Sequence, residues 1–166
     1  MRVRAAALLL ALALPGCGLH PLYSGGSSGA VATMLTRVEV APIAGKSGWL
    51  MSNALRDKLA ANGEAPLYRL EVRLDDKIIG LGVRSDDSVS RERRTLRARY
   101  QLVELAKGTV VLDATAGSDA GIDVVNSEYA TIAAENTALE NLSAIVADQI
   151  VSRVALYAEH APASEP

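Results

Sequence analysis

Two stretches of regular apolar and polar alternation constrain the fold of this chain most. Residues 67–74 (LYRLEVRL) and 95–102 (TLRARYQL) place an apolar side chain at each even-numbered position and a charged or amide side chain between most of them. A period of two puts alternate side chains on opposite faces of a β-strand. Each stretch therefore predicts a strand that is buried on one face and solvated on the other, and the buried faces need covering elements.

Two further strands are predicted. Residues 36–40 (TRVEV) alternate in the same way and are followed by Pro42, which cannot continue a ladder. Residues 109–116 follow a turn that ends at Gly108. We expect the glycines within residues 117–121 to end this last strand.

The strand that begins at residue 67 is expected to continue into a long hairpin arm. After Asp75 and Asp76 the apolar residues change phase and fall on Ile79, Leu81 and Val83. One extra residue reverses the facing of a strand, so the phase change predicts a β-bulge near Asp75 and Asp76 and a bent arm. Residues 85–90 (SDDSVS) are then its polar tip.

Two segments have helical spacing of apolar residues. The first covers residues 50–59, with Ser47 as its N-cap and Asn62-Gly63 after its end. The second runs from about residue 129 to residue 157, with Asn126 or Ser127 as its cap. The element order predicts an α+β fold in which two helices pack on one face of a mainly antiparallel four-stranded sheet.

The first 16 residues have the pattern of an export signal. Arg2 and Arg4 precede an apolar run over residues 5–14, which is too short to span a bilayer as a helix. Of 17 basic and 19 acidic residues, cleavage removes two arginines and leaves a net charge of −4. Cys17 follows the run directly, in the sequence Leu-Pro-Gly-Cys, which resembles a bacterial lipobox. We expect Cys17 to be lipidated, with the acyl chains anchoring the protein to a membrane; an ordinary cleavage site beside a leftover cysteine is the alternative.

These boundaries predict the domain organisation. Residues 1–16 are the removed signal peptide, residues 17–32 are the lipidated cysteine and a flexible Gly/Ser tether, residues 33–158 are one α+β domain, and residues 159–166 are a disordered tail. Position 18, directly after the cysteine, is Gly rather than Asp. By resemblance to the sorting pattern of bacterial lipoproteins, this residue indicates export to the outer membrane.

Catalytic candidates are few. His20 falls in the tether and His160 in the tail, and no metal-ligand, nucleotide or nucleophile motif occurs. The adjacent acids Asp75-Asp76 and Asp86-Asp87 fit solvated turns better than an acid/base dyad, although a cell-wall hydrolase would use such a pair. We therefore expect no enzyme and no cofactor. With 4% aromatic residues, no Phe and little net charge, a nucleic-acid partner is not expected either.

Basic residues gather on the predicted hairpin. Eight arginines lie between positions 69 and 99 in a mildly acidic chain. Guanidinium groups suit phosphate or carboxylate ligands, and clustered like charge favours an anionic partner. The alternative is a solvated face balanced by Glu71, Asp75 and Glu92. The candidate contact residues are Arg91, Arg93, Arg94, Arg97 and Arg99, and Arg69 and Arg73 fit the alternative better.

Three segments together resemble the LPS-assembly lipoproteins of the LptE family, in particular their alphaproteobacterial branch. They are residues 17–23 (CGLHPLY), residues 94–102 (RTLRARYQL) and residues 127–150, from SEYA to ADQI. The resemblance implies a small α/β lipoprotein that sits in the lumen of a large outer-membrane β-barrel on the periplasmic side, plugs it, helps it assemble and assists insertion of lipopolysaccharide into the outer leaflet.

The resemblance also implies partners: the barrel, lipopolysaccharide, and the outer membrane through the lipid anchor. Phosphates of lipid A and the inner core, or uronate carboxylates, are then plausible ligands of the arginines. The same arginines could instead contact acidic residues of the barrel wall, and the sequence does not separate these two uses. A free-standing lipid- or ligand-binding lipoprotein is the alternative function, and it would need a sizeable apolar cavity between helices and sheet.

Overall fold

A computed structural model of the chain describes residues 29–60, 63–83 and 89–160. The predictions for the signal peptide, for Cys17 and most of the tether, for the end of the hairpin and for residues 161–166 lie outside this part. The elements, in chain order, are α2 (Ala30–Leu35), β1 (Val38–Val40), α3 (Gly45–Leu59), β2 (Tyr68–Val83), β3 (Val89–Glu104), β4 (Thr109–Asp123) and α4 (Glu128–His160).

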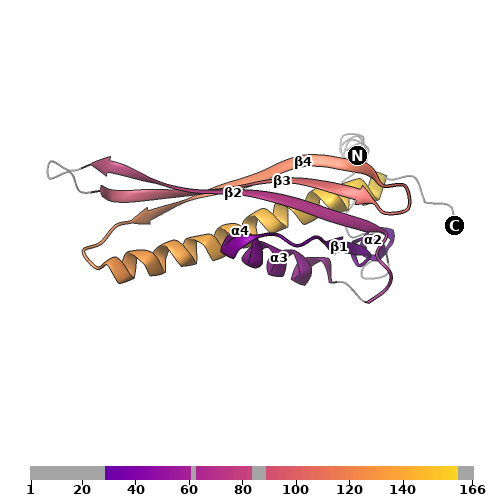
Figure 1. The fold of residues 1–166 in the computed structure, drawn as a ribbon, viewed down its shortest axis with the longest axis horizontal. Helices are drawn as coiled ribbons and strands as arrows, with labels where there is room; N and C mark the ends of the chain where they lie inside the picture. The colour runs from indigo at the N-terminus through magenta and orange to yellow at the C-terminus, as the bar shows by residue number, and fades with distance from the viewer. Residues whose placement is uncertain (1–28, 61–62, 84–88, 161–166) are drawn as a thin grey trace, which may run out of the picture.

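The strands form one sheet in the order β1-β2-β3-β4, and the two long helices lie on one side of it (Figure 1). β1 runs parallel to β2, whereas β2, β3 and β4 pair as antiparallel neighbours. The α+β prediction is confirmed, with one parallel pairing that makes the sheet mixed. The parallel pairing follows from α3, which connects β1 and β2 as a crossover helix.

The core fills the layer between sheet and helices. Tyr100 and its even-numbered neighbours on β3 are buried, as their alternation predicts, and they face the apolar stripe of α4. Because the chain has no Phe, aliphatic side chains make up most of this layer. The largest fully buried ones are Met51, Leu55 and Leu59 from α3, Leu70 from β2, Leu96 and Leu102 from β3, and Leu139, Leu142, Val146, Ile150 and Val154 from α4.

The bulge predicted at Asp75 and Asp76 is wrong. β2 and β3 keep one register along their whole length, with Asp75 opposite Arg97 and Asp76 opposite Leu96. The apolar residues change phase because the arm changes which face is apolar: Ile79 and Leu81 lie on the side away from the helices, and Asp76 faces the helices. The irregularity in the sheet lies instead between Leu102 and Val103, in the pairing with β4.

Several element boundaries also differ from their prediction. Ser47 lies inside α3, whose N-cap is Ala44, and Ala60 ends this helix in the left-handed conformation. β4 continues through residues 117–121 because they pair with residues 97–93 of β3, and the pairing goes on to Asp123 opposite Arg91. α2, beginning at Ala30, was not predicted, and α4 includes two residues assigned to the tail. The cap of α4 is Ser127, whose Oγ accepts a hydrogen bond from the Ala130 amide at 3.4 Å.

Candidate functional site

The sheet face opposite the helices carries rows of charged side chains. The odd-numbered residues of β2 and β3, and those of β4 from Asp113 onward, point to this face, because their even-numbered neighbours face the helices. Arg69, Arg73, Arg97 and Arg99 therefore share one face, as the alternation predicts. We call it the charged face; Arg91 and Arg93 extend it toward the hairpin tip.

β4 supplies acidic partners that the sequence analysis did not consider. Asp113, Asp119 and Asp123 lie on the charged face, next to the arginines of β3. Arg91 bonds Asp123, Arg97 bonds Asp119 and Arg99 bonds Asp113, each pair at 3.0 Å. These exposed pairs are individually weak, but they hold the guanidinium planes in place. A search for acids at odd positions of residues 109–123 would have found them.

Two arginines of the charged face are not neutralised in this way. Among the described residues, Arg73 and Arg93 have no ion pair, and both are exposed. Arg73 lies directly opposite Arg99 and lines with it a hollow of about 170 Å³, together with Glu71 and Gln101. Such a hollow, with one unpaired guanidinium at its wall, can take the oxygen atoms of a phosphate or carboxylate.

The carboxylates of this face are held ionised by their neighbours. Hydrogen bonds from Arg99 and Gln101 lower the pKa of Asp113 below its ordinary value. Hydrogen bonds from Thr95 and Arg97 lower the pKa of Asp119, and the charge of Arg93 contributes as well. The paired acids therefore stay negative near neutral pH, and Arg73 and Arg93 provide the positive charge that an anion can use.

Arg94 does not belong to this face, although the sequence analysis places it with Arg93 among the candidate contact residues. It faces α4, and its side chain is only 11% exposed. Its guanidinium bonds both carboxylate oxygens of Asp76, at 2.8 and 2.7 Å, and donates to the backbone oxygen of Glu135 at 2.8 Å. Arg94 thus joins the hairpin arm to α4, and its role is structural.

A carboxyl pair lies beside this ion pair. Glu92 faces α4, and its Oε2 is buried without a hydrogen-bond partner among the described residues. Its pKa is raised above the ordinary value, first by desolvation, then by the charge of Glu135 and by a hydrogen bond between the two carboxyl groups. Two acids and the pair Asp76–Arg94 therefore meet where the arm crosses α4.

Replacing Glu92 with glutamine is expected to stabilise the fold more at pH 7 than at pH 4. The folded chain keeps the Glu92 proton to a higher pH than the unfolded chain does. The stability that this group contributes is therefore greatest below its ordinary pKa and falls as the pH rises above it. Thermal unfolding of the full chain at both pH values measures the effect, with the exposed Glu140→Gln as control. An equal shift of the melting temperature at both pH values would contradict a raised pKa of Glu92 in the folded chain.

The described residues offer little for catalysis. Asp75 and Asp76 lie on opposite faces of β2 and bond Lys77 and Arg94, respectively. They cannot act on one substrate as a dyad. No group of three His, Cys, Asp or Glu side chains in the described ranges is arranged to hold a metal ion. None of the helices in these ranges combines the length and apolarity that crossing a membrane needs.

The chain matches a family described as lipopolysaccharide-assembly, LptE, over residues 35–154. The chain belongs to this family. The LptE match runs from the last residue of α2 through most of α4, and it confirms the resemblance drawn from the sequence. No curated protein is significantly similar to the chain.

Solved structures of bacterial lipoproteins share the fold of this LptE-family chain. A lipoprotein from Caulobacter crescentus is 26% identical with a TM-score of 0.67, over 81% of this chain and all of its own. A minor lipoprotein from Acinetobacter baumannii is 17% identical with a TM-score of 0.55, over 74% of this chain and 94% of its own. Rare lipoprotein B from Shewanella oneidensis is 11% identical with a TM-score of 0.55, over 74% and 96%. The last two establish the fold alone.

Proposed function

We propose that this chain is a non-enzymatic outer-membrane lipoprotein, anchored through Cys17, that plugs and helps assemble a β-barrel lipopolysaccharide translocon. Its membership of the lipopolysaccharide-assembly family carries the proposal. The lipobox at Cys17 supports the lipid anchor. The similarity to solved structures of bacterial lipoproteins supports the location in the outer membrane. Within the barrel the chain assists insertion of lipopolysaccharide into the outer leaflet.

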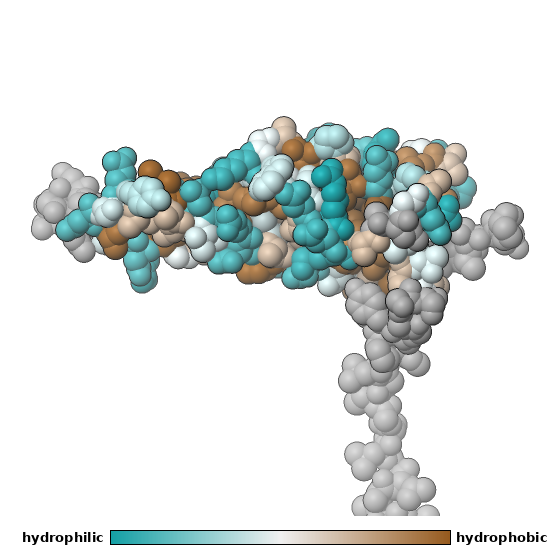
Figure 2. All heavy atoms as spheres, turned by 90° about the horizontal axis from the view of Figure 1, so that it is seen from below, coloured by the Kyte–Doolittle hydropathy of each residue, from teal (hydrophilic) through white to brown (hydrophobic). Residues whose placement is uncertain are grey.

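The outer surface of the helical layer supports contact with a partner on the side opposite the charged face. Viewed from this side, apolar side chains are interspersed among polar ones (Figure 2). Trp49 is 64% exposed on α3, and Tyr129 is 84% exposed near the start of α4. Exposed aromatic side chains of this kind are enriched at protein interfaces. A plug that is enclosed by a barrel contacts it on several sides.

The alternative function, a free-standing lipid-binding lipoprotein, receives less support. It needs an apolar cavity between sheet and helices that can hold an acyl chain. In the described residues that layer is occupied by fully buried side chains such as Leu96, Leu142 and Val146. We therefore place the ligand at the charged face, outside the core.

Purification through a C-terminal tag tests the partner. We expect a large outer-membrane barrel to be recovered with the chain at a ratio near one to one. Recovery of the chain alone from solubilised outer membranes would overturn the proposal. A tag on an unrelated outer-membrane lipoprotein controls for barrels that adhere without specificity.

Replacing Arg73 and Arg93 together with glutamate is expected to weaken binding to lipopolysaccharide by roughly tenfold at low salt. Both side chains are exposed and unpaired among the described residues, so the fold should be retained. The loss should shrink at high salt because exposed charges are screened. Binding to immobilised lipopolysaccharide measures it, with Arg153→Glu on α4 as control.

The outcome also separates two uses of the charged face. Reduced lipopolysaccharide binding with normal barrel recovery supports a glycolipid ligand. Normal lipopolysaccharide binding with reduced barrel recovery would assign Arg73 and Arg93 to the barrel wall. Because Arg91, Arg97 and Arg99 already bond aspartates, we expect each of them to contribute less than the unpaired arginines.

A further inference from the structure

A second apolar cluster lies on the side of the sheet that faces away from the helices. Val103 is only 8% exposed, but the core between sheet and helices does not include it. As an odd-numbered residue of β3 it points to the side of the charged face, and its Cα partner on β4 is Val110. The Leu105 amide donates to the Leu67 oxygen at 2.9 Å, which extends the β2–β3 register by one residue. Leu67, Val103, Leu105 and Val110 therefore form two adjacent cross-strand pairs, which we call the end patch.

Most of the end patch is open to solvent. Leu67, Leu105 and Val110 are 37%, 36% and 51% exposed, and only Val103 is buried. Single exposed aliphatic side chains are common on protein surfaces, but adjacent ones on neighbouring strands form a continuous apolar surface. Such a surface indicates a contact site.

The charged residues next to the end patch neutralise one another. Arg69, the partner of Val103 on β2, bonds Glu71 at 3.1 Å, and Lys107 bonds Glu104 at 3.1 Å. These two ion pairs leave the four residues without net charge. A contact made at the patch therefore depends on apolar area rather than on ion pairing.

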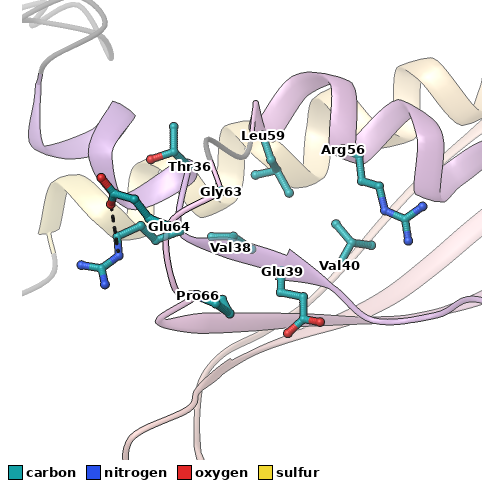
Figure 3. Close-up of a pocket in the computed structure, with 10 residues that line it drawn as sticks. Thr36, Val38, Glu39, Val40, Arg56, Leu59, Gly63, Glu64 and Pro66 are labelled. Carbon is teal, nitrogen blue, oxygen red and sulfur yellow. Dashed lines mark ion pairs between the residues drawn. The ribbon is translucent and has the colours of Figure 1, made fainter.

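The end patch lies at the same end of the molecule as α2. Arg37 follows this helix closely, and its backbone oxygen accepts the Leu67 amide at 2.9 Å. Its Nε lies 3.7 Å from Oε2 of Glu64, in the segment that leads into β2 (Figure 3). The turn between β3 and β4 lies at this end as well (Figure 1). The chain that enters α2 therefore starts close to the patch.

The position of the expected lipid decides which surface the patch can reach. Gly29, directly before α2, comes twelve positions after Cys17. Twelve residues span at most about 40 Å, and a flexible Gly/Ser-rich chain of that length reaches roughly 20 Å on average. Ile79 lies twelve residues beyond Leu67, roughly 40 Å farther along β2. A lipid at Cys17 therefore keeps the end patch near the bilayer and leaves the hairpin arm farther from it.

We propose that, before the chain enters the barrel, the end patch rests on the surface of the bilayer that holds the Cys17 lipid, with Leu105 and Val110 inserted between headgroups and acyl chains. The inference rests on the lipid anchor of the proposed function. Three partly exposed aliphatic side chains bind a bilayer weakly by themselves, but the anchor makes the contact intramolecular and raises its effective concentration to about the millimolar range. The barrel wall fits the patch less well, because the interior of such barrels is polar.

Fluorescence quenching in vesicles tests the contact. Cys17 is the only cysteine and is blocked by its lipid, so a dye can be attached to Ala106→Cys, at an exposed position in the turn beside the patch. The lipidated full chain is placed in phosphatidylcholine vesicles that contain nitroxide-labelled lipid. We expect quenching of this dye to exceed quenching at Ile79→Cys at least fivefold. Ile79 is the matched control because it is an exposed aliphatic residue on the same face of β2.

The same experiment separates the contact from the anchor. Equally low quenching at positions 106 and 79, in a chain that floats with the vesicles, would overturn the contact and leave the proposed function intact. A chain that does not float with the vesicles would overturn the anchor of the proposed function.

Removing the apolar side chains tests the cause of the contact. Leu105→Gln with Val110→Gln is expected to lower quenching of the dye at Ala106→Cys at least threefold. Ile145→Gln, at an exposed position on α4, should leave it unchanged. Thermal unfolding checks that the double variant keeps its fold.

Salt and crosslinking distinguish the bilayer from other occupants. Quenching should be the same at low and high salt, because the charges beside the patch are paired; a loss at high salt would assign the contact to charged residues and overturn the proposal. A photoreactive residue in place of Leu105 that crosslinks to the barrel, combined with no quenching in vesicles, would assign the patch to the barrel wall and overturn it as well.

Discussion

Replacing Asp76 with alanine is expected to lower the free energy of unfolding by about 3 kcal/mol. Asp76 is the partner of Arg94, and the two side chains are only 19% and 11% exposed. Without Asp76, a guanidinium group remains largely desolvated between the hairpin arm and α4. Urea denaturation of the full chain measures the loss, and faster amide exchange in the arm should accompany it.

The neighbouring pair provides a matched control. Asp75 and Lys77 are 58% and 68% exposed, so Asp75→Ala should cost less than about 0.5 kcal/mol. Replacing both buried partners, in Asp76→Leu with Arg94→Met, should recover most of the lost stability because no charge is left unpaired. Equal losses for Asp75→Ala and Asp76→Ala would show that the arm is not held to α4 by this ion pair.

Replacing Gly48 with alanine is expected to destabilise the fold by about 2 kcal/mol, although alanine is the better helix former. Gly48 is buried near the start of α3, and an added Cβ would lie 2.5 Å from the backbone oxygen of Ile43 and 2.7 Å from its carbonyl carbon. Backbone atoms cannot rotate aside as a side chain can. The start of α3 would have to move away from the loop that follows β1.

Gly121→Ala is the comparison for this change. Nothing lies within 4 Å of a Cβ added at Gly121, and this residue is exposed. We expect its free energy of unfolding to change by less than about 0.5 kcal/mol. Urea denaturation of the full chain measures both variants. If Gly48→Ala stabilised the protein by about 1 kcal/mol, as helix propensity alone predicts, the close approach of Ile43 would be contradicted.

The sequence predicted the elements whose patterns have a single structural interpretation. The alternation around Leu70 and Leu96 requires the even-numbered, apolar side chains to face the core. The apolar stripe of residues 129–157 in the same way predicts the long helix. The phase change after Asp76 has two interpretations, a bulge or an exchange of apolar faces, and a single sequence does not distinguish them. The glycines at positions 117 and 121 looked like strand breakers, but the pairing of β4 with β3 outweighs their low strand propensity.

The candidate site was predicted only in part, for a similar reason. Odd-numbered positions placed Arg97 and Arg99 together, but Arg94 was grouped with Arg93 although consecutive residues of a strand face opposite ways. The partners of the arginines come from β4, which follows them by 14 to 32 residues in the chain. Such pairing depends on strand register, which residue composition alone does not reveal.

The length of α4 sets the scale of the molecule against a membrane. At about 1.5 Å per residue, its 33 residues extend over roughly 50 Å, whereas the hydrocarbon core of a bilayer is about 30 Å thick. Held along the axis of a barrel, a rod of this length would protrude by nearly two-thirds of a membrane core. The proposed plug is therefore long enough to contact the membrane-embedded wall and structures on the periplasmic side at the same time.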